Sequence, residues 1–202
     1  MRDGYEINFK NPLFVSDEVQ PASLDAKALL RTLLSSRDLE ALKQAVLSGQ
    51  LPSDKSFFGQ SARVFLIEKV IEANLEEQEQ AIEQLLEADA TVWFSDVVAA
   101  IKSDLSDDLV KRLWQHSTLD GSRVLQKGTV FLSLVNIAIE QQRAELAQYF
   151  LEIGSPTAPD PFGFAALDLL AKYQGKLSEQ QTVSLFKSLY RVSNRYYPRF
   201  SS

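Results

Sequence analysis

The stretch that decides the fold class is RAELAQYFLEIG, residues 143–154. Its apolar residues recur at intervals of three and four, the spacing that gathers them on one face of a helix. Gly154 follows the last periodic residue, at a position where glycine commonly ends a helix. The stretch therefore predicts an amphipathic helix with a glycine C-cap.

The same design occurs three more times, in residues 37–49, 80–90 and 108–116. Gly49 ends the first of these copies, and Asp89 stands in the glycine position of the second. Each copy is preceded by a shorter apolar segment that predicts a helix, and a fifth such segment follows Gly154. These segments span about 24–35, 61–73, 95–103, 131–140 and 164–173. A pair of such short helices cannot bury its apolar faces alone, so the pairs must stack on their neighbours.

Residues 154–170 carry a more specific pattern. The segment 160–163, Asp-Pro-Phe-Gly, has the form of an Asp-x-x-Gly turn, and residues 165–168, Ala-Ala-Leu-Asp, follow it where a helix begins. Residues 133–139 fill the same helix-start positions one repeat earlier, with no gap before Gly154. No repeat contains the sequence Thr-Pro-Leu-His. Over residues 133–171 the chain nevertheless resembles the ankyrin-repeat family, as a divergent member with about five degenerate repeats.

The resemblance implies an all-α solenoid of stacked antiparallel helix pairs. It also implies protein–protein recognition through the concave face and the turn tips. Composition independently favours helices, because the chain has only 8 Gly and 7 Pro among 202 residues. At this length, with 45% hydrophobic residues, we expect an extended segment at 1–20 and a single domain at 21–202 that ends in a capping helix.

Composition also narrows the classes of function. The absence of cysteine excludes disulfides and thiolate metal sites and fits a cytoplasmic protein. No stretch approaches the roughly 18 apolar residues of a membrane span, so we expect no membrane partner. The net charge of −6 disfavours nucleic acid as the main partner. We expect an unidentified protein as partner, and the oligomeric state stays open.

Catalytic and cofactor chemistry lack the residues they need. His116 is the only histidine, so a catalytic triad has a single candidate base and no thiol. Its place near a helix end beside Trp114 is typical of an exposed surface histidine. We expect no bound metal or cofactor, and a binding protein rather than an enzyme.

A stripe of carboxylates runs along the helix predicted at 80–90. Its members are Glu76, Glu79, Glu83 and Glu87, spaced three, four and four residues apart. No Lys or Arg occurs between Lys69 and Lys102, so little local pairing is expected and the stripe could attract a basic partner. A solvated outer helix face is the other interpretation. The stripe supports an alternative function, that of a non-ankyrin helical-repeat regulatory or immunity-type protein that binds a basic partner.

Aromatic residues gather at the predicted turns. They are Phe57 and Phe58, Trp93 and Phe94, and Phe162 with Phe164. Large apolar groups at turn tips are either covered by the next turn or presented to a partner as anchors. We expect Trp93 and Phe94 in the core because they open a helix. For the other aromatic residues both alternatives stay open, and Phe57, Phe58, Phe162 and Phe164 are candidate partner-binding residues.

The C-terminal region carries the clearest basic patch. Lys187, Arg191 and Arg195 lie four residues apart, on one face of a predicted helix that also contains several aromatic residues. They are candidate partner-binding residues for nucleic acid or for a phosphorylated or acidic ligand. The same pattern is typical of a capping helix whose outer face is solvated.

Overall fold

The computed structural model describes residues 20–57, 64–117, 125–127, 130–132, 134–153 and 166–196. These residues form ten α-helices, one short 3-10 helix and one two-stranded hairpin. The elements are α1 (Leu24–Ser36), α2 (Leu39–Leu47), α3 (Leu66–Glu72), α4 (Gln78–Glu87), α5 (Phe94–Ile101), α6 (Asp107–His116), β1 (Leu125–Lys127), β2 (Val130–Leu132), α7 (Leu134–Glu140), α8 (Ala144–Glu152), α9 (Ala166–Tyr173), η1 (Gln174–Lys176) and α10 (Glu179–Tyr196).

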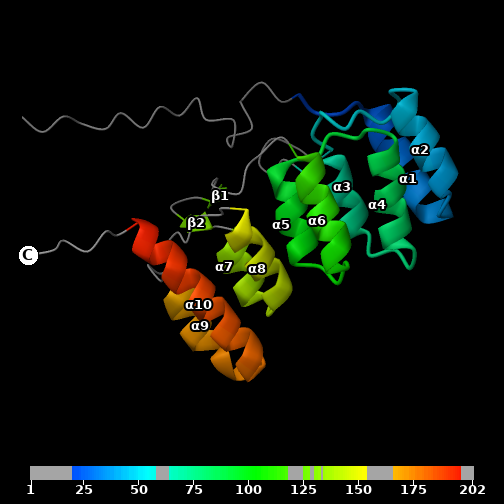
Figure 1. The fold of residues 1–202 in the computed structure, drawn as a ribbon. Helices are drawn as coiled ribbons and strands as arrows, with labels where there is room; N and C mark the ends of the chain where they lie inside the picture. Colours follow the sequence, from blue (N-terminus) through cyan, green and yellow to red (C-terminus); the bar gives the residue numbers. More distant parts are fainter. Residues whose placement is uncertain are drawn as a thin grey trace, which may run out of the picture.

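The helices contact one another in consecutive pairs, α1 with α2, α3 with α4, α5 with α6, α7 with α8 and α9 with α10. Neighbouring pairs then contact through like members, so two rows of helices result (Figure 1). One row contains α3, α5, α7 and α9. The other, called the second row below, contains α2, α4, α6, α8 and α10. The prediction of an all-α fold is confirmed.

The helix ends explain why the sequence breaks where it does. Ser23 and Asp38 precede α1 and α2, and their side chains accept hydrogen bonds from the backbone N–H groups of Ala26 and Ala41. After α2 the chain turns through Gly49 with a positive φ of 74°. After α4 the corresponding residue is Asp89, with φ at 56°. The prediction that Asp89 stands in a glycine position is therefore confirmed.

Apolar side chains from every helix pair join in one core. A single cluster of buried hydrophobic residues runs from Ala22, before α1, to Leu189 in α10. Leu86 of α4, Leu113 of α6 and Phe150 of α8 all belong to it. Each pair thus buries its apolar faces partly against its own partner helix and partly against the neighbouring pair.

Two boundaries differ from the sequence-based expectation. Helix was expected from about residue 131, but α7 begins at Leu134, and residues 130–132 pair antiparallel with residues 125–127 instead. Val130 and Phe131 favour extended backbone, which explains the short strand. Helix was also expected from about residue 61, whereas α3 begins at Leu66. The extended segment predicted for residues 1–20 lies, except for its last residue, outside the described residues.

Candidate recognition surface

The carboxylates of the acidic stripe are held by neighbouring helices of the second row. Glu76, just before α4, lies 2.7 Å from the guanidinium of Arg37, which is next to α2. At the other end of α4, Glu87 lies 2.5 Å from the ammonium of Lys43 in α2. Hydrogen bonding to Glu87 raises the pKa of Lys43, and the same bond lowers the pKa of Glu87.

The other two carboxylates of the stripe face α6. Glu83 lies 2.5 Å from a guanidinium nitrogen of Arg112 in α6. Glu79 accepts a 2.5 Å hydrogen bond from the backbone N–H of Ser106, at the N-terminus of α6. The expectation of little local pairing is confirmed, because the partners of these carboxylates lie 27 to 44 residues away in the chain. We call the three ion pairs Arg37–Glu76, Lys43–Glu87 and Arg112–Glu83 the charge seam.

In the part of the chain that the structure describes, the aromatic residues predicted as anchors at the turns do not form an exposed surface. Phe57 is 1% exposed and belongs to the core, so its role as an exposed anchor is wrong: neighbouring segments cover the ring. Phe58, Phe162 and Phe164 lie outside the described residues. The expectation for Phe94 is confirmed, since it is 5% exposed.

Trp93 is half-buried and contacts two other segments. Its indole ring stacks on Phe65, with the ring centroids 4.3 Å apart. Its Nε1–H donates a 3.0 Å hydrogen bond to the carbonyl oxygen of Ser53. The ring thus packs within the fold, but Trp93 does not belong to the buried core, so the expectation for this residue is met only in part.

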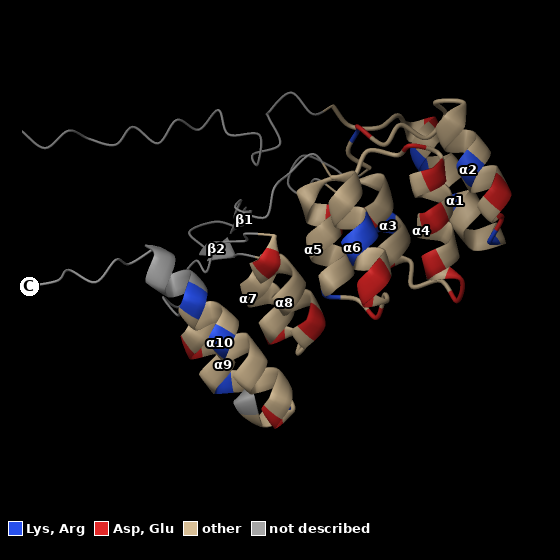
Figure 2. Cartoon of the chain, viewed as in Figure 1, with Lys and Arg blue, Asp and Glu red and all other residues tan. Residues whose placement is uncertain are grey.

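The predicted basic patch lies on α10, the last helix. Lys187 and Arg191 are exposed, and Arg195 belongs to the same helix. Figure 2 shows basic positions in blue along α10. The rings of Phe186 and Tyr190 stack beside these cations with centroids 6.2 Å apart, and they are 53% and 45% exposed. One turn earlier, Val183 is 44% exposed. Leu185 and Leu189 on another side of α10 are buried, so the helix has one covered apolar face and one uncovered apolar strip.

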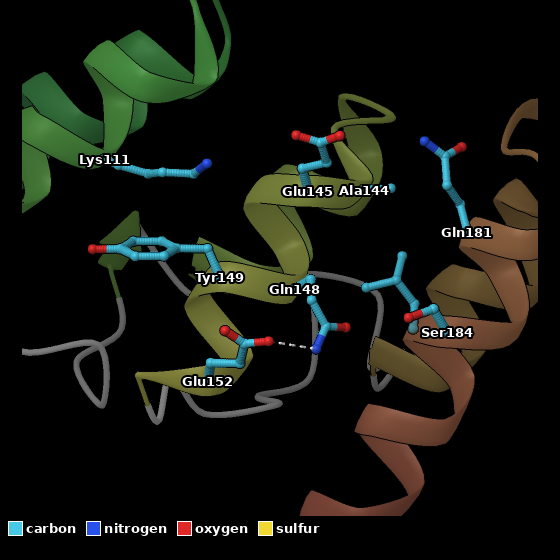
Figure 3. A pocket seen from close by; sticks show the side chains of 9 residues that line it. Lys111, Ala144, Glu145, Gln148, Tyr149, Glu152, Gln181 and Ser184 are labelled. Carbon is cyan, nitrogen blue, oxygen red and sulfur yellow. Dashed lines mark hydrogen bonds between the residues drawn. The ribbon is translucent and has the colours of Figure 1, made fainter.

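A cleft of about 330 Å³ lies where α8 and α10 meet (Figure 3). On the α8 side its walls include Glu145, Gln148, Tyr149 and Glu152. The amide of Gln148 donates a 3.0 Å hydrogen bond to the carboxylate of Glu152. These four side chains occupy one face of α8 because they are spaced three to four residues apart.

The opposite wall of the cleft belongs to α10, and one further residue comes from α6. Gln181, Ser184 and Leu185 project from α10. From α6, the ammonium of Lys111 lies over the Tyr149 ring, 5.9 Å from its centroid. This cation–π contact spans the second row between α6 and α8. The cleft thus combines an apolar base with carboxylates, amides and one engaged cation.

Arg143, whose role the sequence did not reveal, joins the α7–α8 pair to the α5–α6 pair. Its guanidinium contacts the Asp107 carboxylate, with Nε to Oδ1 at 2.8 Å. It also donates hydrogen bonds to the carbonyl oxygens of Ala100, Ile101 and Leu105 at 3.0, 3.1 and 2.6 Å. The side chain is only 14% exposed. It satisfies carbonyl groups that the end of α5 leaves without helical partners.

Asp96, whose role the sequence also did not reveal, connects the starts of α3 and α5 through hydrogen bonds. Its fully buried carboxylate accepts hydrogen bonds from the backbone N–H groups of Glu68 (2.9 Å) and Trp93 (2.7 Å). Burial raises the pKa of Asp96 to about 7, although these two hydrogen bonds act in the opposite direction. Its position, three residues after the N-cap Trp93, is the acidic position of a capping box and could have indicated half of this role.

The remaining observations concern metal, membrane and catalytic chemistry. His116 is the last residue of α6 and is exposed, as expected. Among the described residues, no group of three or more His, Asp or Glu side chains is arranged to hold a metal ion. None of the helices in the described ranges is long and apolar enough to cross a membrane.

The chain was also compared with known proteins. No protein-family model, curated protein or solved structure matches it.

Proposed function

We propose that this chain is a protein-recognition module built from stacked helix pairs of the ankyrin type. The consecutive pairing of helices and the positive-φ residues Gly49 and Asp89 after α2 and α4 support that architecture. Stacked pairs present rigid, preorganised surfaces, so binding requires little additional ordering.

The recognition surface that we propose is the α8–α10 face, defined by the cleft residues Glu145 and Glu152, the cations Lys187 and Arg191, and the apolar strip Val183, Phe186 and Tyr190. The stacked Phe186 and Tyr190 rings carry the proposal, because both are about half exposed beside two exposed cations. Aromatic and arginine side chains contribute a large share of the binding energy at protein interfaces.

The acidic stripe supports the alternative function less well. Three of its carboxylates are occupied in the charge seam, and Glu79 accepts a hydrogen bond from a backbone N–H group. A basic partner would have to displace these contacts before it gained new ones. The α8–α10 face requires no such displacement from Phe186 or Lys187.

Site-specific photo-crosslinking in living cells tests the proposal. We expect the full chain with Phe186 replaced by the photoreactive residue p-benzoylphenylalanine to give a discrete protein adduct on irradiation. Leu24 is the matched control, because it is an apolar helix residue that is 83% exposed at the opposite end of the chain. The same replacement at Leu24 should give no discrete adduct.

Either of two outcomes would contradict the proposal. The absence of any adduct from position 186 would exclude a partner at the α8–α10 face. Equal adducts from positions 186 and 24 would indicate nonspecific contact with exposed apolar residues. The circular dichroism spectra of both variants should match that of the wild type. A difference in crosslinking then does not result from loss of folding.

A further inference from the structure

Charged side chains are arranged differently at the two ends of the second row. Between α2 and α4, and between α4 and α6, acidic side chains meet basic side chains in the charge seam. Between α8 and α10 the described residues form no ion pair, although α8 carries Glu145 and Glu152 and α10 carries Lys187 and Arg191. The contact there relies instead on buried leucines and a 3.0 Å hydrogen bond from Ser188 to Gln148.

These four charges divide the α8–α10 face into two halves. Glu145 and Glu152 line the cleft on its α8 side, about 10 Å apart along the helix at 1.5 Å per residue. Lys187 lines a second hollow on α10, which shares Ser184 with the cleft. Arg191 follows Lys187 by about 6 Å along the same helix. Lys111 also lines the cleft, and Glu179 lines the second hollow. With these two charges included, a half of net acidic charge and a half of net basic charge lie side by side, with Ser184 between them.

Such a face is complementary to itself. A two-fold axis through the region of Ser184 sets the acidic half of one copy against the basic half of the other, and the reverse contact forms at the same time. The charges that find no partner across the α8–α10 contact are then paired between copies. The exposed Phe186 and Tyr190 rings beside Lys187 supply apolar area at the edge of the same contact.

We propose that the partner of the α8–α10 face is a second copy of this chain, bound as a symmetric dimer. This inference rests on the proposed function, since it names the protein that the surface recognises. Two helices form a small contact area, so the dimer belongs to the weak, reversible class with a dissociation constant on the order of micromolar. Its charged contacts also make the dimer sensitive to ionic strength.

Sedimentation equilibrium of the full chain tests the dimer. At about 50 mM salt, where screening is weak, we expect a reversible monomer–dimer equilibrium between about 10 and about 300 µM protein. At about 500 mM salt the dissociation constant should rise roughly tenfold or more. A wild-type chain that stays monomeric over the whole range at low salt overturns the inference.

Charge reversal locates the contact. The variant Lys187→Glu/Arg191→Glu makes both halves of the face acidic, and Glu145→Lys/Glu152→Lys makes both halves basic. Each variant alone should dimerise more than about 100-fold more weakly, because like charges then oppose each other. An equimolar mixture should recover the association as a heterodimer. Recovery also demonstrates that both variants are folded.

The matched control is Lys27→Glu/Arg31→Glu on α1, which reverses two cations four residues apart at the far end of the chain and should leave dimerisation unchanged. A wild-type dimer that survives both reversals on the α8–α10 face uses another surface and overturns the inference. Failure of the inference is separable from failure of the proposed function. A monomeric chain whose Phe186 variant still crosslinks a different protein retains the function and loses only the second copy as partner.

Discussion

Between α2, α4 and α6, acidic side chains meet basic ones from neighbouring helices. At the α8–α10 contact, by contrast, Glu145 and Glu152 line a cleft on the α8 side and Lys187 lines a second hollow on α10. Both regions have the same second-row helices and draw on the same core cluster. The difference lies only in which residues occupy the exposed helix positions. A repeated architecture can thus close one stretch of its surface with internal ion pairs and leave another stretch able to bind.

The free energy of unfolding should depend on pH because the fold buries one carboxylate. At the start of α5, burial raises the pKa of Asp96 from its usual value of 3.8 to about 7. The folded state then holds a proton between pH 4 and 7 that the unfolded state has released. The free energy of unfolding should therefore fall as pH rises through this window, by as much as about 4 kcal/mol, and level off above it.

Urea denaturation of the wild type and of Asp96→Asn between pH 4 and 8 measures this dependence. The asparagine variant keeps one carbonyl acceptor but cannot titrate, so its stability should vary less with pH over this window. A wild type whose stability instead rises from pH 4 to 7 would show that the two backbone hydrogen bonds outweigh burial and keep the carboxylate ionised.

The junction between the two regions should be the next most sensitive point. Arg143→Met keeps the aliphatic stem but removes the guanidinium, which leaves the Asp107 carboxylate and several carbonyl oxygens without this donor. We expect a loss of about 3 kcal/mol in the free energy of unfolding, measured by urea denaturation. Arg37→Met removes an exposed ion pair and is the control, with an expected loss below about 1 kcal/mol. Equal losses would mean that Arg143 does not join the regions as its contacts indicate.

The smallest expected effect concerns the charge seam itself. A double-mutant cycle of Arg112→Met and Glu83→Gln should give a coupling energy below about 1 kcal/mol, because both side chains are nearly half exposed. Thermal denaturation at low and high salt measures it. A coupling energy above about 2 kcal/mol would mean that the charge seam contributes strongly to stability and does more than pair exposed charges.

The order of helices could be predicted from the sequence because apolar periodicity and helix caps are local signals. Gly49 and Asp89 marked two helix ends correctly for the same reason. The partners of the acidic stripe could not be predicted, since they lie 27 to 44 residues away in the chain. Local sequence reports that Glu83 and Glu87 share a helix face, but not which helix packs beside that face.

In the candidate site, too, some features have local sequence signals and others depend on elements remote in the chain. Lys187 and Arg191 could be placed on an exposed helix face from their spacing alone. The sequence left open whether Phe57 was covered or presented, because that depends on the segment packed against it. The cleft at Glu145 and Glu152 lies between helices that are more than 25 residues apart in the chain, so no local sequence pattern predicts it.

The junction at Arg143 also has a consequence for synthesis in the cell. Asp107, which Arg143 contacts, precedes it by 36 residues in the chain. At a translation rate of about 5 to 20 residues per second, roughly 2 to 7 s separate their appearance. During that interval α6 is completed, while the guanidinium that contacts the end of α5 is still missing. The contacts that Arg143 makes with Asp107 and with the end of α5 can therefore form only after Arg143 has left the ribosome.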